Sequence, residues 1–571
     1  MEKAENFFRR WGPIGIFTAL VFSPNLVAAY FLARDESMQI AVYLLLFSLM
    51  TSMVPMVLVK TLRQFFIVYV PLAFIASAYV GYTLWFRRPP SEGIVAAVIH
   101  TNFGEAFELV ALAGWGALIS LLWGGIYTVF VFRSKTLHAK VGPRSKKIFA
   151  AACAIYLIAA AWNFEIVDED PLYGQVYHFI SADGPHKTIP LLDKQTIQNS
   201  FPIGLAHALF STASLNDAVA SSSYRFHAHK RQAIADKEIH ILIIGESARF
   251  KNWGANGYAR PTSPHLSARA QQGQVISFSD MAAQSNLTSF AAGMMVSGQT
   301  PAIYASTKKI EATVADAFKE SGFTTGWISN QDFMYPPAVD FSDFDWSLHR
   351  LDEAMLPVIE RALARHDNKT FLVIHTRGSH TNYDQRYAKR YKVFAPTLDD
   401  VMDKLPPWAR FKTGQGATSK DMREALVNSY DNSILATDDL INEVVSLVES
   451  KHAVSTVLYV SDHGEDLCDD DRQLFMHGKA NATKYEIHIP AFLWTSAEFR
   501  ARYPEKQEAL KEHASSKLSQ ANVLPTLLDM ADVSWEKEDL TKSFASKKFV
   551  EPARRDVLTA ASIIETYEDL K

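Results

Sequence analysis

Cysteine is scarce in this chain of 571 residues, and neither sign of charge is in clear excess. The two cysteines, Cys153 and Cys468, lie far apart, one in an apolar run and one in a polar segment. We therefore expect no disulfide to stabilise the second half of the chain. The net charge of −4 argues against a nucleic-acid partner, because such proteins usually carry a basic domain or stripe. No internal repeat and no low-complexity tract stands out.

Long apolar stretches are concentrated in the first third of the chain. Five of them approach or reach the ~20 residues that a helix needs to cross a ~30 Å hydrocarbon core. The first lacks a small-residue cleavage site, so we expect it to stay as a span and not to be a cleaved signal. A set of buried core helices is the alternative, but five in succession with so few charges favour spans. The predicted spans are 13–33, 38–59, 65–86, 109–132 and 147–163.

Basic residues are distributed unequally among the short segments around these stretches. They precede the first span, and they recur between the second and third and between the fourth and fifth. The loops on the opposite side hold fewer of them. Basic loops face the cytoplasm, so five spans place everything after about residue 164 on the far side of a bacterial inner membrane, in the periplasm.

The rest of the chain divides into a linker and a larger domain. Residues 164–236 carry short amphipathic pieces, which predict segments lying on the membrane surface; a disordered tether is the alternative for parts of them. We expect domains at 1–163, 164–236 and 237–571, with the tail from about 536 helical or loose.

Short β-branched apolar runs alternate with amphipathic helical stretches from Glu238 onward. Runs that are apolar throughout are typical of strands buried on both faces, as in a parallel sheet covered by helices. The fold class we predict is therefore a transmembrane bundle followed by an α/β domain with a mainly parallel central sheet. The predicted strands are 239–245, 324–329, 371–375, 455–461 and 489–495.

Two of these runs end in acidic groups, one in Glu246 and the other in Asp462 and His463. Active sites of open α/β sheets form at the carboxyl ends of strands. Carboxylates and an imidazole are suitable ligands for Zn²⁺. Each motif alone is weak, because a single Glu there is often a helix-start charge and Asp-His-Gly is often a turn. Together they favour a metal site.

A hydroxyl group is the third element of this predicted site. Asn286-Leu287-Thr288-Ser289 precedes a run of small residues that predicts a helix. The N-terminus of a helix offers free backbone N–H groups to a phosphate oxygen, and a metal lowers the pKa of a bound hydroxyl. Spacing alone leaves open whether this is a nucleophile or a simple N-cap, and whether the nucleophile is Thr288 or Ser289.

The ordered motifs of the second half resemble those of the phosphoethanolamine transferases, in the alkaline phosphatase and sulfatase superfamily. The resemblance covers roughly residues 236–530, and the five-span layout is also similar to that family's. The motifs are GESAR (245–249), NGYARPTSP (256–264), NLTS (286–289), ISNQ (328–331), HTRGSH (375–380), YDNSIL (430–435), SDHGE (461–465), MHG (476–478) and IPAFLW (489–494).

The resemblance implies a role for each matching residue. Glu246, Thr288, Asp462 and His463 match the zinc ligands, for one zinc ion or two, and Thr288 matches the nucleophile that carries phosphoethanolamine. His380 and His477 match histidines at the transferred phosphate, either of which suits acid or base chemistry. Without the resemblance they are a strand-end and a loop histidine.

Further positions bear on the substrates that the resemblance implies. Thr101 and Glu105 match donor-binding positions of lipid A-modifying members, although Ala97 stands where an Asn is expected. The lack of disulfides resembles the cysteine-poor branch. The implied reaction moves phosphoethanolamine from phosphatidylethanolamine to a lipid-linked glycan or lipopolysaccharide through a phospho-threonine. Rival interpretations are a phosphoglycerol transferase, a sulfatase-like hydrolase, and a membrane sensor with an inactive enzyme domain.

Overall fold

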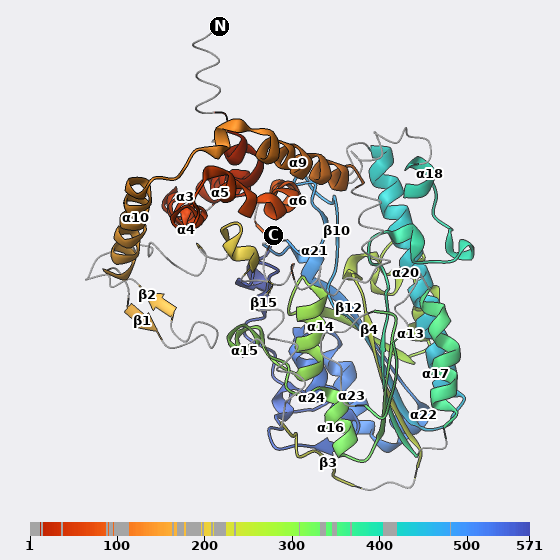
Figure 1. Cartoon of the computed structure of the whole chain (residues 1–571). Helices are drawn as coiled ribbons and strands as arrows, with labels where there is room; N and C mark the ends of the chain where they lie inside the picture. Colours follow the sequence, from red (N-terminus) through yellow and green to blue (C-terminus); the bar gives the residue numbers. More distant parts are fainter. Residues whose placement is uncertain are drawn as a thin grey trace. The chain divides into compact units, whose positions relative to one another are not determined.

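The computed structural model divides the chain into two compact units, which we describe separately (Figure 1). The first holds the described residues up to Leu209, and the second holds those from Tyr224 onward. Residues outside the description are 1–11, 13–14, 36–37, 87–88, 91–94, 96–113, 163–164, 168–175, 179–195, 197–198, 207–208, 210–223, 233–235, 308, 332–338, 345–350, 366–367, 403–419 and 480.

Apolar helices dominate the first unit. Among its described residues, Gly15–Arg34 and Met38–Leu58 are long and apolar enough to cross a membrane. The bent pair Leu62–Val68 and Val70–Leu84, with 49° between its parts, is a third if it counts as one span. The described elements are a π-helical turn (Thr18–Phe22), α2 (Ser23–Asp35), α3 (Met38–Met53), α4 (Pro55–Leu58), α5 (Leu62–Val68), α6 (Val70–Phe86), α9 (Gly114–Arg133), α10 (Pro143–Trp162) and a small hairpin, β1 (Glu165–Val167) with β2 (Val176–His178).

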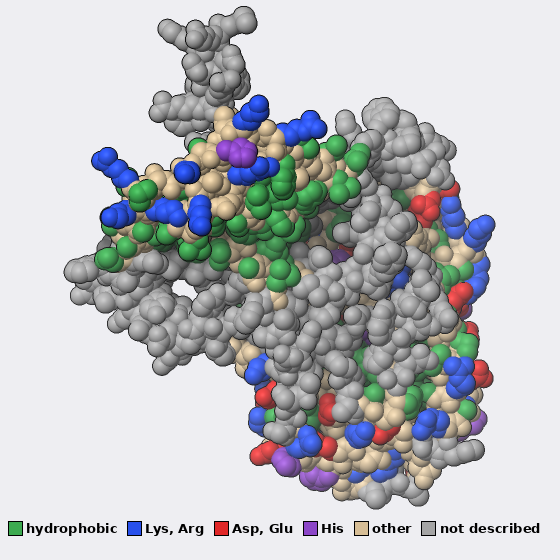
Figure 2. Space-filling view, in the orientation of Figure 1, with side chains coloured by type: hydrophobic (Ala, Val, Ile, Leu, Met, Phe, Trp, Pro, Cys, Tyr) green, Lys and Arg blue, Asp and Glu red, His purple; other side chains and the backbone are tan. Residues whose placement is uncertain are grey.

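The described residues thus support two or three of the five predicted spans. The stretch predicted at 109–132 begins outside the described residues and continues as α9, of which Leu118–Arg133 counts as an apolar helix among the residues searched. The stretch predicted at 147–163 lies in α10, but residue 163 and several side chains at the end of this helix lie outside the description, so this span stays a prediction. Hydrophobic side chains nevertheless gather on the outer surface over these helices, with Lys and Arg along one margin (Figure 2).

An eight-stranded sheet forms the centre of the second unit, in the order β13-β5-β12-β9-β4-β8-β6-β7. Every strand runs in one direction except β12, which pairs antiparallel with both of its neighbours. The sheet is therefore mixed although mainly parallel. The strands are β4 (Glu238–Gly245), β5 (Val275–Ala282), β6 (Thr324–Ser329), β7 (Phe341–Phe344), β8 (Lys369–His375), β9 (Val454–Ser461), β12 (His488–Thr495) and β13 (Leu518–Ser519).

The five predicted apolar runs correspond to β4, β6, β8, β9 and β12. Three strands were not anticipated: β5, β7 and β13. Polar residues such as Ser279 and Asp280 interrupt β5, and the other two are short. A mainly parallel sheet was predicted, and β12 is the one antiparallel strand in it, because a run of apolar residues carries no information about strand direction.

Helices cover both faces of this sheet. Figure 1 places α13 (Pro264–Gln271), α17 (Leu356–Leu363) and α20 (Lys420–Glu449) together on one side. On the other side lie α14 (Thr288–Ser297), α16 (Val314–Glu320) and α24 (Val523–Met530). The remaining elements are β3 (His229–Lys230) with β14 (Val533–Ser534), α15 (Pro301–Thr307), α18 (Leu398–Met402), β10 (Asp466–Leu467) with β11 (Phe475–Met476), α21 (Lys484–Ile487), α22 (Ala497–Arg502), α23 (Pro504–Glu512), and β15 (Asp556–Leu558) with β16 (Ile564–Thr566).

The tail from residue 536 is ordered, which corrects the prediction of a loose or helical segment. Strands β15 and β16 form a hairpin within it. The Arg555 side chain is only 3% exposed and donates to Asp280 Oδ1 on β5 at 2.6 Å and to Glu568 Oε1 at 2.8 Å. The tail's charges therefore attach it to the sheet, close to the segment that leads into α14.

Candidate metal centre

The ends of β4 and β9 bring the predicted acidic groups together. These strands are parallel neighbours with Gly245 opposite Ser461, so Glu246 and Asp462 leave the sheet side by side. The Asp462 N–H donates to the Gly245 carbonyl at 2.9 Å, and the Ser247 N–H donates to Asp462 Oδ1 at 3.0 Å. His463 follows directly, with Nε2 at 3.6 Å from Glu246 Oε1 and 3.2 Å from Asp462 Oδ2. All three side chains are fully buried.

Hydrogen bonds fix both oxygens of the Glu246 carboxylate. Ser247 Oγ donates to Oε1 at 2.7 Å, and Gln331 Nε2 donates to Oε2 at 2.8 Å. Gly378 packs against the backbone of Glu246, where a Cβ would stand 2.7 Å from the Glu246 carbonyl oxygen, and its φ of +45° also favours glycine. Gln331 and Gly378 lie within motifs of the sequence, but nothing in their spacing pointed to these contacts.

Thr288 is the first residue of α14 and reaches the same point. Its Oγ1 lies 3.1 Å from His463 Nε2 and 3.4 Å from Glu246 Oε1. Leu287 is the N-cap of the helix, and no side chain caps it, so Thr288 does not have the simple N-cap role. Ser289 Oγ is buried, has no hydrogen-bond partner in the part of the chain that the structure describes, and is not part of this group. The geometry thus brings the Thr288 hydroxyl, and not that of Ser289, to His463 and Glu246, a choice that spacing alone left open.

Asn286 holds the segment that carries Thr288. Its Nδ2 donates to the Lys479 carbonyl at 2.9 Å, and its Oδ1 accepts from the Ala560 N–H at 2.8 Å. The Lys479 ammonium is itself paired with Asp466 at 2.7 Å. Buried amides with both ends satisfied restrict the backbone around them. Two distant parts of the chain, one of them the tail, therefore position the Thr288 loop.

The donor set fits a divalent metal such as zinc. Among the described residues, no group donates a hydrogen bond to the buried Asp462 Oδ2, which is costly for a carboxylate oxygen. Burial raises the pKa of the Asp462 carboxyl to about 7, against the effect of the hydrogen bonds from Ser247 and His463. A cation in contact with Oδ2 would favour the ionised form. Glu246 and Asp462 oxygens, His463 Nε2 and Thr288 Oγ1 together match the N/O ligands that zinc takes.

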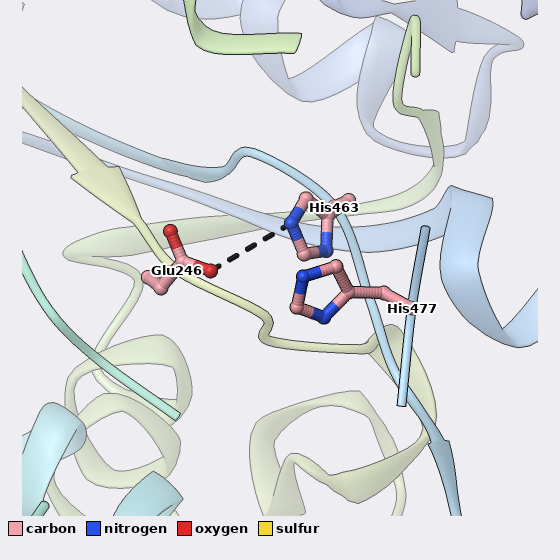
Figure 3. A group of neighbouring side chains, drawn as sticks. All are labelled: Glu246, His463 and His477. Atoms are coloured by element: carbon pink, nitrogen blue, oxygen red, sulfur yellow. Dashed lines mark ion pairs between the residues drawn. The ribbon is translucent and has the colours of Figure 1, made fainter. Parts of the chain in front are cut away.

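His477 and His380 lie beside this centre. Glu246, His463 and His477 form a group whose potential ligand atoms lie within 4.8 Å of one another (Figure 3). The ring centroids of His463 and His477 are 4.1 Å apart, and those of His380 and His477 are 5.8 Å apart. Burial lowers the pKa of His380 to about 4 and lowers that of His477 well below its usual value. Both are therefore neutral imidazoles in the folded protein near pH 7.

Glu465 was not predicted as a site residue, although it ends the SDHGE motif. Its Oε2 lies 2.8 Å from His477 Nδ1, and its Oε1 accepts from Tyr383 Oη at 2.9 Å. A carboxylate in this place orients the imidazole of His477. The predicted donor-binding residues Thr101 and Glu105 lie outside the described residues.

Comparison with known proteins places these motifs in a family. A family model described as Sulfatase matches residues 239–533. The phosphoethanolamine transferase EptA of Escherichia coli strain K12 is 26% identical over 314 residues, which are 52% of this chain and 54% of EptA. The chain thus spans about half the length of the curated relatives it matches.

Solved structures share the fold. The integral membrane protein lipooligosaccharide phosphoethanolamine transferase A of Neisseria meningitidis has a TM-score of 0.60 at 20% identity, with 92% of this chain and 98% of that one covered. The C-terminal periplasmic domain of EptC from Escherichia coli, in complex with Zn, has a TM-score of 0.53 at 21% identity, with 61% and 98% covered. The predicted resemblance to phosphoethanolamine transferases is confirmed, and the chain belongs to the sulfatase family.

Proposed function

We propose that this protein transfers phosphoethanolamine from phosphatidylethanolamine to a lipid-linked glycan or lipopolysaccharide, with Thr288 as the nucleophile. The observation that carries the proposal is the position of Thr288 Oγ1, which the N-terminus of α14 brings within hydrogen-bonding distance of His463. The names of the sequence relatives support the choice of transferred group. The membrane-facing first unit and the periplasmic domains of relatives support a location in the inner membrane with the second unit in the periplasm.

Glu246, Asp462, His463 and Thr288 would hold a zinc ion in this proposal. Zinc bound there would neutralise negative charge on the phosphate and lower the pKa of the threonine hydroxyl. One ion would satisfy these four donors, which leaves His380 and His477 for acid and base chemistry. Gln331 and Ser247 orient the Glu246 carboxylate toward the hydroxyl.

In the first step, Thr288 Oγ1 attacks the phosphorus of phosphatidylethanolamine. A bond forms between Oγ1 and phosphorus, and the bond from phosphorus to the diacylglycerol oxygen breaks. The hydroxyl proton goes to a neutral imidazole, for which His477 is placed by Glu465. The protonated imidazole then supplies a proton to the diacylglycerol oxygen. Free N–H groups at the start of α14 bind a phosphate oxygen.

In the second step, an oxygen of the acceptor attacks the phospho-threonine. The acceptor loses its proton to an imidazole, the bond between phosphorus and Oγ1 breaks, and Oγ1 recovers a proton. His380 lies on the His477 side of the centre and is the second candidate for this exchange. The site is thereby restored, and phosphoethanolamine is attached to the acceptor.

The first unit has a part in this proposal because donor and acceptor are both lipids. A site held at the bilayer surface meets lipid substrates at high local concentration. Thr101 and Glu105 are the proposed contacts of the ethanolamine head group, whose ammonium suits a carboxylate.

Substitution of Thr288 tests the proposal. Thr288→Ala should lower transfer by roughly a thousandfold or more, because the nucleophile is removed, whereas Ser289→Ala serves as the matched control and should keep most of the activity. The assay is mass spectrometry of phosphoethanolamine added to envelope lipids and glycans, with phosphatidylethanolamine or phosphatidylglycerol as donor. A phosphoethanolamine adduct on the peptide that contains Thr288 is the expected intermediate. Full transfer by Thr288→Ala would overturn the mechanism, and transfer of glycerol phosphate alone would overturn the donor.

A further inference from the structure

A groove in the second unit is lined by residues that take no part in the proposed chemistry. Its volume is about 430 Å³. One wall is the segment that follows Glu246, with Arg249, Lys251 and Tyr258; the other is α21 and the start of β12, with Lys484, Tyr485 and His488. The groove adjoins the His463 loop directly, since a Cβ on Gly464 would stand 2.1 Å from the Tyr485 carbonyl oxygen.

The groove has a surplus of positive charge. None of the ten residues that line it, all within the described chain, is acidic. The Arg249 guanidinium is neutralised by Asp469, to which it donates two hydrogen bonds of 2.6 and 2.9 Å. Lys251 is 59% exposed with its Nζ 3.8 Å from the same carboxylate, and Lys484 is exposed as well. Burial lowers the pKa of His488, so it adds no charge near pH 7. The two lysines supply the surplus.

Aromatic rings with fixed orientations form the rest of the groove. The Phe250 ring stacks on His488 with 4.2 Å between centroids and 6° between planes. The Tyr485 ring lies 5.2 Å from both the Arg249 guanidinium and Lys251 Nζ. Phe250, Tyr258 and Tyr485 are only partly buried. Partly exposed rings that are already held in place can take up a ligand ring with little loss of side-chain freedom.

The geometry points to a binding site for an acidic saccharide. Its sugar rings lie against the aromatic side chains, and its phosphate or carboxylate groups meet Lys251 and Lys484. A hollow of this volume suits a ligand of a few rings, whereas a bilayer surface is too flat to fill it. Two lysines are too few for a nucleic acid, whose affinity comes from many phosphate contacts. This inference does not depend on the proposed transfer; if the transfer is right, the groove holds the glycan of an acceptor.

A direct binding measurement tests the site. The probe is a glucosamine disaccharide with two phosphates, titrated calorimetrically into the full chain in detergent, with the phosphate-free disaccharide alongside. Lys251→Ser with Lys484→Ser should weaken binding of the phosphorylated probe by roughly tenfold or more, because two charge-assisted contacts are lost, and should flatten its salt dependence. The matched control, Lys511→Ser with Lys548→Ser, removes the same charge from exposed positions elsewhere and should bind as the unaltered protein does.

The outcomes separate this inference from the proposed function. The lysine variant should hydrolyse a small phosphodiester such as bis(4-nitrophenyl) phosphate at the normal rate, because neither lysine touches the metal centre. Lost binding with normal hydrolysis supports the groove even if no phosphoethanolamine is transferred. Three results would overturn the saccharide site. The lysine variant binds the phosphorylated probe as tightly as the unaltered protein does, the phosphate-free disaccharide binds as tightly as the phosphorylated one, or a nucleotide such as AMP binds more tightly than the phosphorylated disaccharide. Loss of anionic-vesicle binding in the lysine variant with saccharide binding intact would overturn it as well.

Discussion

The two units use the same aliphatic side chains in opposite ways. In the second unit, strand residues such as Ile243 and Leu372 are completely buried. In the first, Leu58, Leu121 and Ile155 are 80%, 62% and 67% exposed, whereas Ala73 and Ala76 are completely buried. Small residues at helix contacts and large ones outside are typical of helices packed in lipid. An apolar run in the sequence therefore predicts burial inside the protein only if the solvent around that part of the fold, water or lipid, is known.

Buried polar groups also differ between the units. In the first, Asn25 Nδ2 donates to the Phe201 carbonyl at 2.9 Å, and Ser48 Oγ donates to Asn25 Oδ1 at 2.8 Å. These bonds join helices to their neighbours. In the second, the buried Glu246, Asp462 and His463 face one another at the carboxyl ends of β4 and β9. Buried polar groups thus hold neighbouring segments together in the first unit and form the candidate metal centre in the second.

A pair of identical substitutions tests the comparison most strongly. Leu372→Ala should lower the free energy of unfolding of the second unit by about 2–5 kcal/mol, because it leaves a cavity in a packed core. Leu121→Ala, in an exposed position, should change stability by about 0.5 kcal/mol or less. Denaturant midpoints of the full chain in detergent, followed by tryptophan fluorescence, measure both. A loss for Leu121→Ala as large as that for Leu372→Ala would mean that this face of the first unit packs against protein.

The contrast also explains what the sequence could predict of the fold. The apolar runs marked β4, β6, β8 and β9 because strands buried on both faces need no alternation. They could not reveal β5, whose polar residues bond to the distant Arg555. The number of spans is supported only in part, and for the third of them hydropathy does not distinguish a straight helix from a pair bent by 49°.

A smaller effect is expected from the contact that orients Glu246. Gln331→Ala removes the donor to Glu246 Oε2, so the carboxylate can turn away from the centre. Loss of such a supporting hydrogen bond typically lowers metal affinity by about 10–100-fold. Competition for zinc with a chromogenic chelator measures the change, and excess zinc should restore phosphodiester hydrolysis. Gln272→Ala, at an exposed position, is the control. Zinc affinity unchanged by Gln331→Ala would show that Glu246 keeps its orientation without this bond.

The candidate site was predictable where it follows strand ends and not where it depends on long-range contacts. Residues 246, 462 and 463 could be predicted from the ends of their strands, and Thr288 from the helix that was expected after it. Asn286, Gln331 and Glu465 bond to partners between 12 and 274 residues away. Nothing in local sequence periodicity encodes such pairs, so their roles became apparent only from the folded chain.

The smallest expected effect is a loss of stability of the second unit in acid, which comes from one buried histidine. His240 on β4 is completely enclosed, with Nδ1 2.8 Å from Thr456 Oγ1 and Nε2 3.9 Å from Glu238 Oε2. Burial lowers its pKa, although the neighbouring Glu238 carboxylate partly opposes this and Lys230 and Lys506 add to it. In the unfolded chain His240 therefore binds a proton near pH 6.5, whereas in the folded chain it does so only at lower pH. Stability from this group is complete above about pH 6.5 and falls as the pH drops toward the lower folded pKa.

His240→Gln should remove this part of the acid sensitivity. The free energy of unfolding of the unaltered protein should fall between pH 7 and pH 5 by up to about 1.4 kcal/mol more than that of the variant, for each unit by which the pKa is lowered. His265→Gln, whose side chain is 46% exposed, should leave the pH profile as it is. Denaturant midpoints at several pH values measure the difference. Parallel profiles for His240→Gln and the unaltered protein would mean that His240, at the end of β4 opposite the metal centre, accepts a proton without loss of stability. The contrast in buried charge between the units would then rest on the metal centre alone.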